Sequence, residues 1–354
     1  MLLKKTGPFM GSDNSRWKLI FCSGRSIIGN TSCMILERME MPVYIYLFAA
    51  VLLLVLILTF VLFLVIFYAP NRKQGNSDAI RLPEGEIYRV FWEDMRRWAQ
   101  ETRALPFAEM SVTSFDGLKL YGKYYECIPG APVELMFHGY RGSAERDLSG
   151  GVQRCFQVGH NALLVDQRCS GKSEGHVISF GINEHRDCLT WIDHIIERFG
   201  PDVQIILTGI SMGASTVLMA SGKALPRNVI GVLADCGFHS PKEIILSVAK
   251  SMHLPAHVLY PFVKLGAKLF GRFDLEEYTP LEAMKTCSVP VIFFHGMTDD
   301  YVPCYMSRIN YDACRTRKKL VCIPGAGHGL AYPVAPREYL REVADFFDPL
   351  SAAL

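Results

Sequence analysis

The feature that most constrains this chain is an uncharged apolar run from Val43 to Tyr68, which is 26 residues long. At 1.5 Å per residue, a helix of this length crosses the roughly 30 Å hydrocarbon core of a bilayer with room for tilt. A buried core helix is the alternative, but so long a run without charge is rare in soluble proteins. Aromatic residues, which favour the membrane interface, stand at both ends: Tyr44, Tyr46, Phe67 and Tyr68. We therefore predict a single-pass transmembrane helix at residues 43–69.

Charges on either side of this run favour a cytoplasmic C-terminal domain. The twenty residues before the run carry two arginines, whereas the twenty after Ala69 carry three arginines and one lysine. By the positive-inside rule, the more basic side faces the cytoplasm. Four further cations nearer the N-terminus weaken this prediction. Residues 1–42 show no clear periodicity, and we expect either a disordered tail or an over-extended start that precedes the true initiator.

The composition is that of a globular enzyme-sized chain and not of a nucleic-acid-binding protein. Half of the residues are hydrophobic, a fifth are charged and the net charge is +2. Of the eleven cysteines, nine follow residue 100, and no C-x-x-C pair or zinc-like Cys/His spacing occurs. We interpret them as reduced thiols, which agrees with a cytoplasmic domain. The sequence indicates no metal and no cofactor, and it leaves the oligomeric state open.

After a polar linker at residues 70–84 and a helical pattern at residues 86–104, short apolar strands alternate with helices. This alternation predicts a mostly parallel sheet with helices on both faces. Asp116-Gly117 separates two strand-like segments and predicts a hairpin, which would give the sheet an antiparallel edge. The expected strands are 110–115, 118–125, 133–137, 162–165, 205–208, 229–234, 291–294 and 320–323.

One insertion, residues 241–278, interrupts the alternation after the sixth expected strand. Pro255 and Pro261 divide it into two helical pieces. An insertion at this place can cover the carboxyl ends of the strands, so we predict a lid. Its apolar residues are expected to line an acyl pocket, although ordinary packing within the lid fits them equally well. They are Ile244, Ile245, Leu254, Leu259, Phe262, Leu265 and Leu269.

Gly209-Ile210-Ser211-Met212-Gly213 is the strongest chemical signal in the chain. It follows an expected strand and opens an expected helix, which is the context of a nucleophile elbow. The glycines are required because the turn is so sharp that side chains two residues from the serine would clash. Ser211 is therefore predicted as a nucleophile.

A serine hydroxyl needs a base, and the base needs an acid that orients it. His328, in the small-residue segment that follows the last expected strand, is predicted as the base. Asp299 follows the strand before it and is predicted as the acid, in the chain order serine, aspartate, histidine. Asp300 is the neighbouring alternative, and Asp235, at the end of an earlier strand, is a third.

An oxyanion formed at Ser211 needs two backbone N–H donors. We predict the amides of Met212, which follows the serine, and of Tyr140, in the turn His138–Gly142. The side chain of His138 is expected to be structural, with a role as base the alternative. The loop 166–173 is expected to brace this turn and the elbow through its charged residues.

These segments, in this order and spacing, resemble bacterial α/β-hydrolases of the serine aminopeptidase and monoacylglycerol-lipase-like branch. The resemblance rests on HGYRGS, DQRCSGKSEG, GISMG, HGMTDDYVP and GAGHG, and covers residues 105–348. It implies an eight-stranded sheet, a helical lid, no cofactor and a triad of Ser211, Asp299 and His328. One departure is Cys169, where many relatives have Gly or Ala.

We therefore expect residues 85–354 to form the catalytic domain of a membrane-anchored serine hydrolase. The favoured substrate is a small or lipid-derived carboxylic ester, cleaved through an acyl-serine. A serine peptidase of the aminopeptidase type is the first alternative, for which Glu276 and Glu277 are candidate partners of a substrate amine. A non-catalytic membrane scaffold is the second.

Overall fold

The computed structural model describes residues 30–70 and 80–351, with side chains for residues 43–70 and 80–347. Residues 1–29 of the expected tail and 71–79 of the expected linker lie outside the described residues. The chain divides into two compact units, Met1–Leu54 and Val55–Leu354, and the sheet lies entirely in the second.

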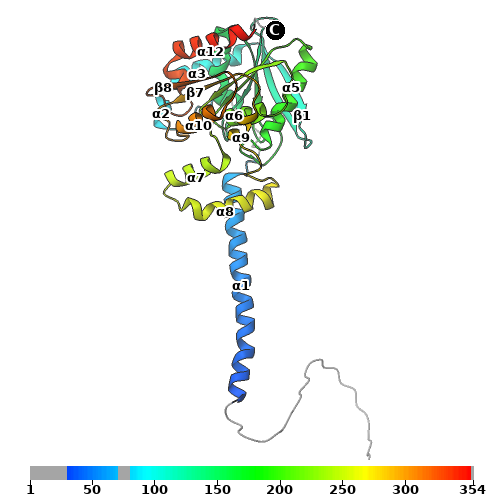
Figure 1. Ribbon diagram of the computed structural model, residues 1–354, viewed down its shortest axis with the longest axis vertical. Coiled ribbons are helices and arrows are strands. Elements are labelled where there is room, and N and C mark those ends of the chain that lie inside the picture. Colours follow the sequence, from blue (N-terminus) through cyan, green and yellow to red (C-terminus); the bar gives the residue numbers. More distant parts are fainter. Residues whose placement is uncertain (1–29, 71–79, 352–354) are drawn as a thin grey trace, which may run out of the picture. The chain divides into compact units, whose positions relative to one another are not determined.

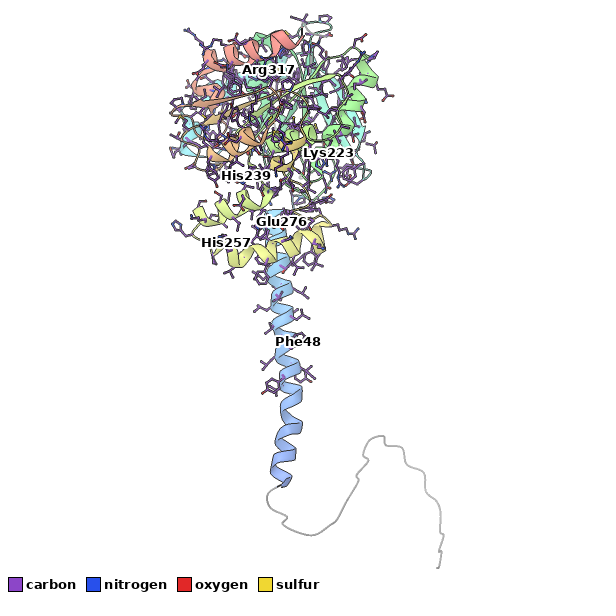
Figure 2. The ribbon with its side chains drawn as sticks, viewed as in Figure 1. Phe48, Lys223, His239, His257, Glu276 and Arg317 are labelled. Carbon is purple, nitrogen blue, oxygen red and sulfur yellow. The ribbon has the colours of Figure 1, made fainter. Side chains whose placement is uncertain are left out.

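Helix α1 spans Asn30–Ile66, and its segment Val43–Ile66 is long and apolar enough to cross a membrane. Figure 2 shows side chains standing out along this helix, among them Phe48, which is 72% exposed. The helix begins thirteen residues before the expected start at 43, so residues 30–42 are helical and not an irregular tail. They contain several good helix formers (Met, Leu, Glu and Arg), and Pro42 lies within the helix without ending it.

Eight strands form one sheet in the order β1-β2-β4-β3-β5-β6-β7-β8. Strand β2 is antiparallel to both of its neighbours, and the remaining pairs are parallel, which confirms the expected fold class. The predicted hairpin joins β1 to β2, with Gly117 at φ 88°. The strands are β1 Ala108–Thr113, β2 Lys119–Tyr125, β3 Val133–Phe137, β4 Asn161–Asp166, β5 Ile205–Ile210, β6 Val229–Asp235, β7 Val291–Gly296 and β8 Lys318–Ile323.

Helices cover both faces of the sheet, so every residue of the central strands β3 and β6 is buried. One face packs against α5 (Glu184–Phe199), α6 (Met212–Ser221) and α9 (Pro280–Thr286). The other packs against α4 (Ala144–Gln157), α11 (Ala331–Val334) and α12 (Pro336–Ser351). The same unit also contains helices α2 (Glu86–Arg89), α3 (Trp92–Ala104) and α10 (Tyr305–Ala313).

The insertion after β6 forms α7 (Pro241–Ser251), α8 (Ala256–Gly266) and a short π-helix, Ala267–Gly271, which continues α8. These helices pack around the last turns of α1 (Figure 1). Phe63 of α1 and Phe67, which directly follows this helix, are buried in one apolar cluster with Tyr260, Val263 and Ala267. Residues from Val55 onward therefore belong to the same compact unit as the sheet.

A buried ion pair joins β3 to α4. The carboxylate of Glu134 accepts hydrogen bonds from Arg154 Nη1 at 3.0 Å and from Thr208 Oγ1 at 2.8 Å, and lies 2.8 Å from His160 Nδ1. Burial disfavours the charge of Glu134, but Arg154 and His160 outweigh burial and hold the pKa of this carboxyl well below its usual range. The carboxylate therefore stays ionised inside the sheet and gives α4 a fixed register on β3.

Glu134→Gln is expected to lower the free energy of unfolding by about 3–5 kcal/mol, because it leaves the Arg154 charge buried without a partner. The matched control is Glu145→Gln, which removes a half-exposed partner of Arg103 and should cost less than about 1 kcal/mol. Unfolding of the purified full chain at pH 7 measures both. Equal losses in the two variants would contradict a structural role for the buried pair.

Candidate active site

Ser211 lies at the junction of β5 and α6, with φ 57° and ψ −121°. A side chain rarely adopts this backbone conformation, and the strained turn aims Oγ away from the strand. Ser211 N donates to the carbonyl of Asp235 at the end of β6, at 2.8 Å, which ties the turn to the neighbouring strand. The local geometry is therefore that of a nucleophile elbow.

Two glycines make this elbow possible, as the sequence predicted. A Cβ on Gly209 would lie 2.3 Å from the carbonyl carbon and oxygen of Gly213. A Cβ on Gly213 would lie 2.0 Å from the carbonyl oxygen of Phe137, at the end of β3. Both neighbours are backbone atoms, which cannot move aside without disturbing the sheet. Hence any side chain at either position would open the turn.

The structure brings Ser211, His328 and Asp299 into one row of hydrogen bonds. His328 Nε2 lies 2.9 Å from Ser211 Oγ, and His328 Nδ1 lies 2.7 Å from Asp299 Oδ2. Asp299 follows β7 and His328 follows β8, so the strand order of the sheet sets the row. Neither alternative acid takes part: Asp300 is exposed, and Asp235 accepts from Tyr339 instead.

The carboxylate of Asp299 is fixed by the backbone as well as by His328. Its Oδ1 accepts from Tyr301 N at 3.0 Å and from Val302 N at 2.8 Å, while His295 Nε2 lies 3.4 Å from Oδ2. Burial opposes ionisation, but His295, His328 and the backbone bonds prevail and lower the pKa of Asp299 to about 2. Asp299 is thus charged at neutral pH. Our sequence analysis missed His295, whose only signal was its place four residues before Asp299.

The turn His138–Gly142 lies directly beside the serine. A Cβ on Gly139 would come within 3.8 Å of Ser211 Oγ, so a side chain there would occupy the space of a substrate carbonyl. The carboxylate of Asp147 accepts from Gly139 N at 3.1 Å and holds the turn from the side of α4. Met212 is the first residue of α6, where a backbone N–H has no partner within the helix. The two predicted donors, Tyr140 and Met212, therefore flank Ser211.

The loop 166–173 braces this turn, as expected, but it does so through Gln167 and Ser170 and not through the charged side chain of Arg168. The backbone N–H of Gln167 donates to His138 Nε2 at 3.1 Å, and its side-chain Nε2 donates to the His138 carbonyl at 2.6 Å. Ser170 Oγ donates to the carbonyl of Gly142 at 2.7 Å. Arg168 turns away and pairs with Asp116 and Asp187. Both ring nitrogens of His138 lie within hydrogen-bond distance of backbone groups, so its side chain is structural.

The same turn also contacts the end of α1. Tyr140 Oη donates to the carbonyl of Ile66 at 2.6 Å, and Arg141 Nη2 donates to the carbonyls of Val65 at 2.8 Å and Tyr68 at 3.1 Å. The last carbonyls of a helix have no partner within it, and these two side chains supply one. Sequence analysis assigned Tyr140 a role for its amide only, so this contact was not foreseen.

Tyr88, on the short helix α2, holds the histidine loop. Its hydroxyl donates to the carbonyl of His328 at 3.0 Å, across 240 positions of sequence. The expected helical segment 86–104 therefore begins with a residue that supports the site. No local motif marks Tyr88, which is why sequence analysis did not single it out.

A cavity of about 520 Å³ reaches Ser211 and His328, and its size suits a small organic ligand. It runs along the sheet face that α4 covers, between residues 83–88 and the segment 328–333. Its apolar walls include Met95, Trp98, Met136, Leu148, Ile210 and Tyr332. Glu84, Arg146 and Asp300 are the charged residues nearest its mouth.

The expected lining of this pocket by the lid is wrong. None of the seven lid residues that the sequence suggested lines the cavity. Ile244 and Ile245 are buried in the cluster that contains Phe63 and Phe67, at the end of α1 and directly after it, while Leu265 and Leu269 are exposed. Packing near the end of α1 therefore accounts for Ile244 and Ile245, while Leu254, Leu265 and Leu269 face outward.

The acidic residues proposed for a substrate amine are also engaged elsewhere. Glu276 pairs with Lys264 and accepts from Tyr260 Oη, and Glu277 pairs with Arg186 at 2.7 Å. Neither lines the cavity. The acidic residues that do line it are Glu84, Glu86, Asp147, Asp235 and Asp300.

Among the described residues, one group has potential metal-ligand atoms within 4.8 Å of one another: Cys236, Asp299 and His328. Two of these atoms already bond to each other. Burial raises the pKa of the Cys236 thiol well above its usual range, so this sulfur stays protonated and is a poor ligand. The nine cysteines after residue 100 are all free thiols, five buried and four half-buried.

Comparison with known sequences gives distant relatives. Residues 179–352 match the model of the prolyl oligopeptidase family. The uncharacterized protein YqkD of Bacillus subtilis is 27% identical over 251 residues, which are 69% of this chain and 82% of that protein. The uncharacterized membrane protein YNL320W of Saccharomyces cerevisiae is 25% identical over 177 residues, which cover 49% of this chain and 56% of that protein.

Comparison with solved structures gives the fold. The Pyrococcus furiosus esterase Pf2001 superimposes with a TM-score of 0.59 at 20% sequence identity, over 80% of this chain and 98% of that one. At this identity the likeness concerns the fold and not the substrate. The chain thus has an α/β-hydrolase fold, with a C-terminal half similar to the prolyl oligopeptidase family and a long apolar helix before the sheet.

Proposed function

We propose that this protein is a serine hydrolase that cleaves a carboxylic ester through an acyl-serine intermediate. The observation that carries the proposal is the row Ser211–His328–Asp299, with both hydrogen bonds shorter than 3 Å. His328 Nε2 takes the proton of Ser211 Oγ as the oxygen attacks the ester carbonyl, then gives it to the departing alkoxide. Asp299 holds the His328 tautomer and stabilises the imidazolium that forms.

The backbone amides of Tyr140 and Met212 are the proposed oxyanion hole. The turn that carries Tyr140 is held by Asp147 and Gln167, which supports a donor that needs little rearrangement when the substrate binds. In the second half of the reaction, His328 takes a proton from water, which attacks the acyl-serine and releases the acid. Removing one such donor typically costs about 10²–10³ in kcat.

The cavity supports an ester with an apolar acyl group of small or medium size. Its walls are mainly apolar, and its volume of about 520 Å³ lies within the range of ligand pockets. A monoacylglycerol-lipase-like activity on a lipid-derived ester fits both this cavity and a chain with one membrane-spanning helix. The similarity in fold to an esterase agrees with this class.

A peptidase of the same fold is the second candidate. It is favoured by the match of residues 179–352 to the prolyl oligopeptidase family and by the acidic residues Glu84 and Asp300 at the cavity. A scaffold without catalysis is the least supported alternative, because Ser211, His328 and Asp299 are all present and hydrogen-bonded.

We further propose a single-pass membrane protein with residues 85–354 as a cytoplasmic catalytic domain.

The first test is labelling with a fluorophosphonate, which reacts with an activated serine. We expect the detergent-solubilised full chain to be labelled and to hydrolyse p-nitrophenyl esters, and Ser211→Ala to do neither. An aminoacyl anilide of matched size distinguishes the second candidate. A folded wild-type chain that is neither labelled nor active would overturn the proposal, and faster cleavage of the anilide than of the ester would favour the peptidase.

The two neighbouring aspartates give a matched test of the acid. Asp299→Asn should lower kcat by about 10⁴-fold, because His328 then loses its orienting partner and its favoured tautomer. Asp300→Asn alters an exposed residue that makes no contact with His328 and should leave kcat within a few-fold of wild type. Steady-state ester hydrolysis measures both, and comparable losses would show that Asp299 is not the acid.

Acyl-chain preference tests the cavity. Ile210→Phe places extra volume beside Ser211, so the preference for hexanoyl over acetyl esters, as a ratio of kcat/KM, should fall by about tenfold. The control is Leu254→Phe, which enlarges a lid residue that does not line the cavity. If Leu254→Phe shifted the chain-length profile and Ile210→Phe did not, the acyl group would lie under the lid.

A further inference from the structure

The outer surface of α8 and of the π-helix that continues it carries an apolar row that the rest of the unit leaves uncovered. Val258 is 64% exposed, Leu265 37% and Leu269 50%, and Phe262 between them is half-buried. Their spacing of four, three and four residues places them along one side of a helix. The opposite side, with Tyr260, Val263 and Ala267, is buried against the rest of the unit. Helix α8 is therefore apolar on its exposed side as well as on its buried side.

A row of basic residues accompanies the apolar row. His257, Lys264 and Lys268 follow one another at spacings of seven and four residues, and the exposed Arg272 follows the π-helix. Lys264 is partly neutralised by Glu276. An apolar row beside a cationic one is typical of helices that lie in a membrane surface, where apolar side chains enter the acyl region and cations meet lipid phosphates.

The neighbour of α8 indicates what covers this row. Gly266 of α8 packs so closely on α1 that a Cβ there would lie 2.9 Å from the Thr59 carbonyl. Phe270 contacts the rings of Phe60 and Phe63 of α1, at 5.0 Å and 5.6 Å between centroids. On the side of α1 that faces away from the lid, Val61 and Val65 stay exposed. The exposed apolar surface of α8 thus continues onto the helix that is apolar enough to span a bilayer.

Helix α8 lies beside the last part of the apolar run. Gly266 packs against Thr59, and Phe270 contacts Phe60 and Phe63, so these contacts fall within residues 59–66, the last eight residues of the segment Val43–Ile66. The end of a membrane-spanning run is where headgroups meet acyl chains, and α8 is therefore expected at that boundary.

We propose that α8 and the π-helix that continues it form a membrane-embedded platform, with Val258, Phe262, Leu265 and Leu269 in the lipid acyl region. The bilayer is then the partner of the lid. The lid has a fixed place beside the anchoring helix, and it does not swing over Ser211. This inference does not depend on the proposed hydrolase activity.

The test places a tryptophan on the platform of the full chain, reconstituted as one copy per lipid nanodisc. The variant is Leu265→Trp, and the emission of the parent, which has four tryptophans, is subtracted. The control is Ile128→Trp, a position of similar exposure that lies near the start of β3, at the sheet edge opposite the carboxyl ends of the parallel strands. Val258→Trp is the second platform variant, in case Leu265→Trp does not fold.

We expect lipids brominated in the upper acyl chain to quench most of the emission added by Leu265→Trp, and aqueous iodide to quench little of it. The control should respond in the opposite way. If iodide quenched both variants equally, the platform would lie in water and the proposal would be overturned. If neither quencher reached Leu265→Trp or Val258→Trp, a protein partner would cover the surface, which would equally overturn it.

Discussion

The close approach of three backbone segments at Ser211 is the constraint on which the site depends. Gly213 at the start of α6 packs against the carbonyls of Phe137 and His138, and Gly209 packs against Gly213. With any side chain at these glycines, the end of β3 would move away from the elbow. The turn that carries Tyr140 would then leave the serine. The pair of glycines thus sets both the exposure of Ser211 Oγ and the position of the proposed oxyanion donors.

The turn after β3 is fixed from three directions, and each contact adds a separate constraint. Asp147 holds it from α4, Gln167 and Ser170 from the loop after β4, and the end of α1 from the third side, through Tyr140 and Arg141. The last contact satisfies helix carbonyls that would otherwise lack donors. The end of the apolar helix is therefore part of the framework around the site.

Local patterns carried most of what the sequence could predict. Short apolar runs located all eight strands, and the steric demand of the elbow identified Ser211 through its glycines. His328 and Asp299 followed from their positions after the last two strands. The roles of Tyr88 and Asp147 were not predicted, because both residues act through hydrogen bonds to backbone groups elsewhere in the chain. No sequence motif indicates such contacts. The predicted lining of the pocket by the lid failed for a different reason. Apolar residues at helical spacing are equally compatible with a ligand pocket, a protein core and a lipid surface.

The placement of the lid changes which residues can select a substrate. Because α7 and α8 pack on α1 and do not line the cavity, selection of the acyl group in the proposed reaction would fall to residues 83–88, to α4 and to the segment 328–333. The first of these segments follows α1 in the chain, and its Tyr88 also holds the His328 loop. A change of sequence there would act on the cavity wall and on the base together. Substrate preference and the position of His328 are therefore coupled through one short segment, independently of the lid.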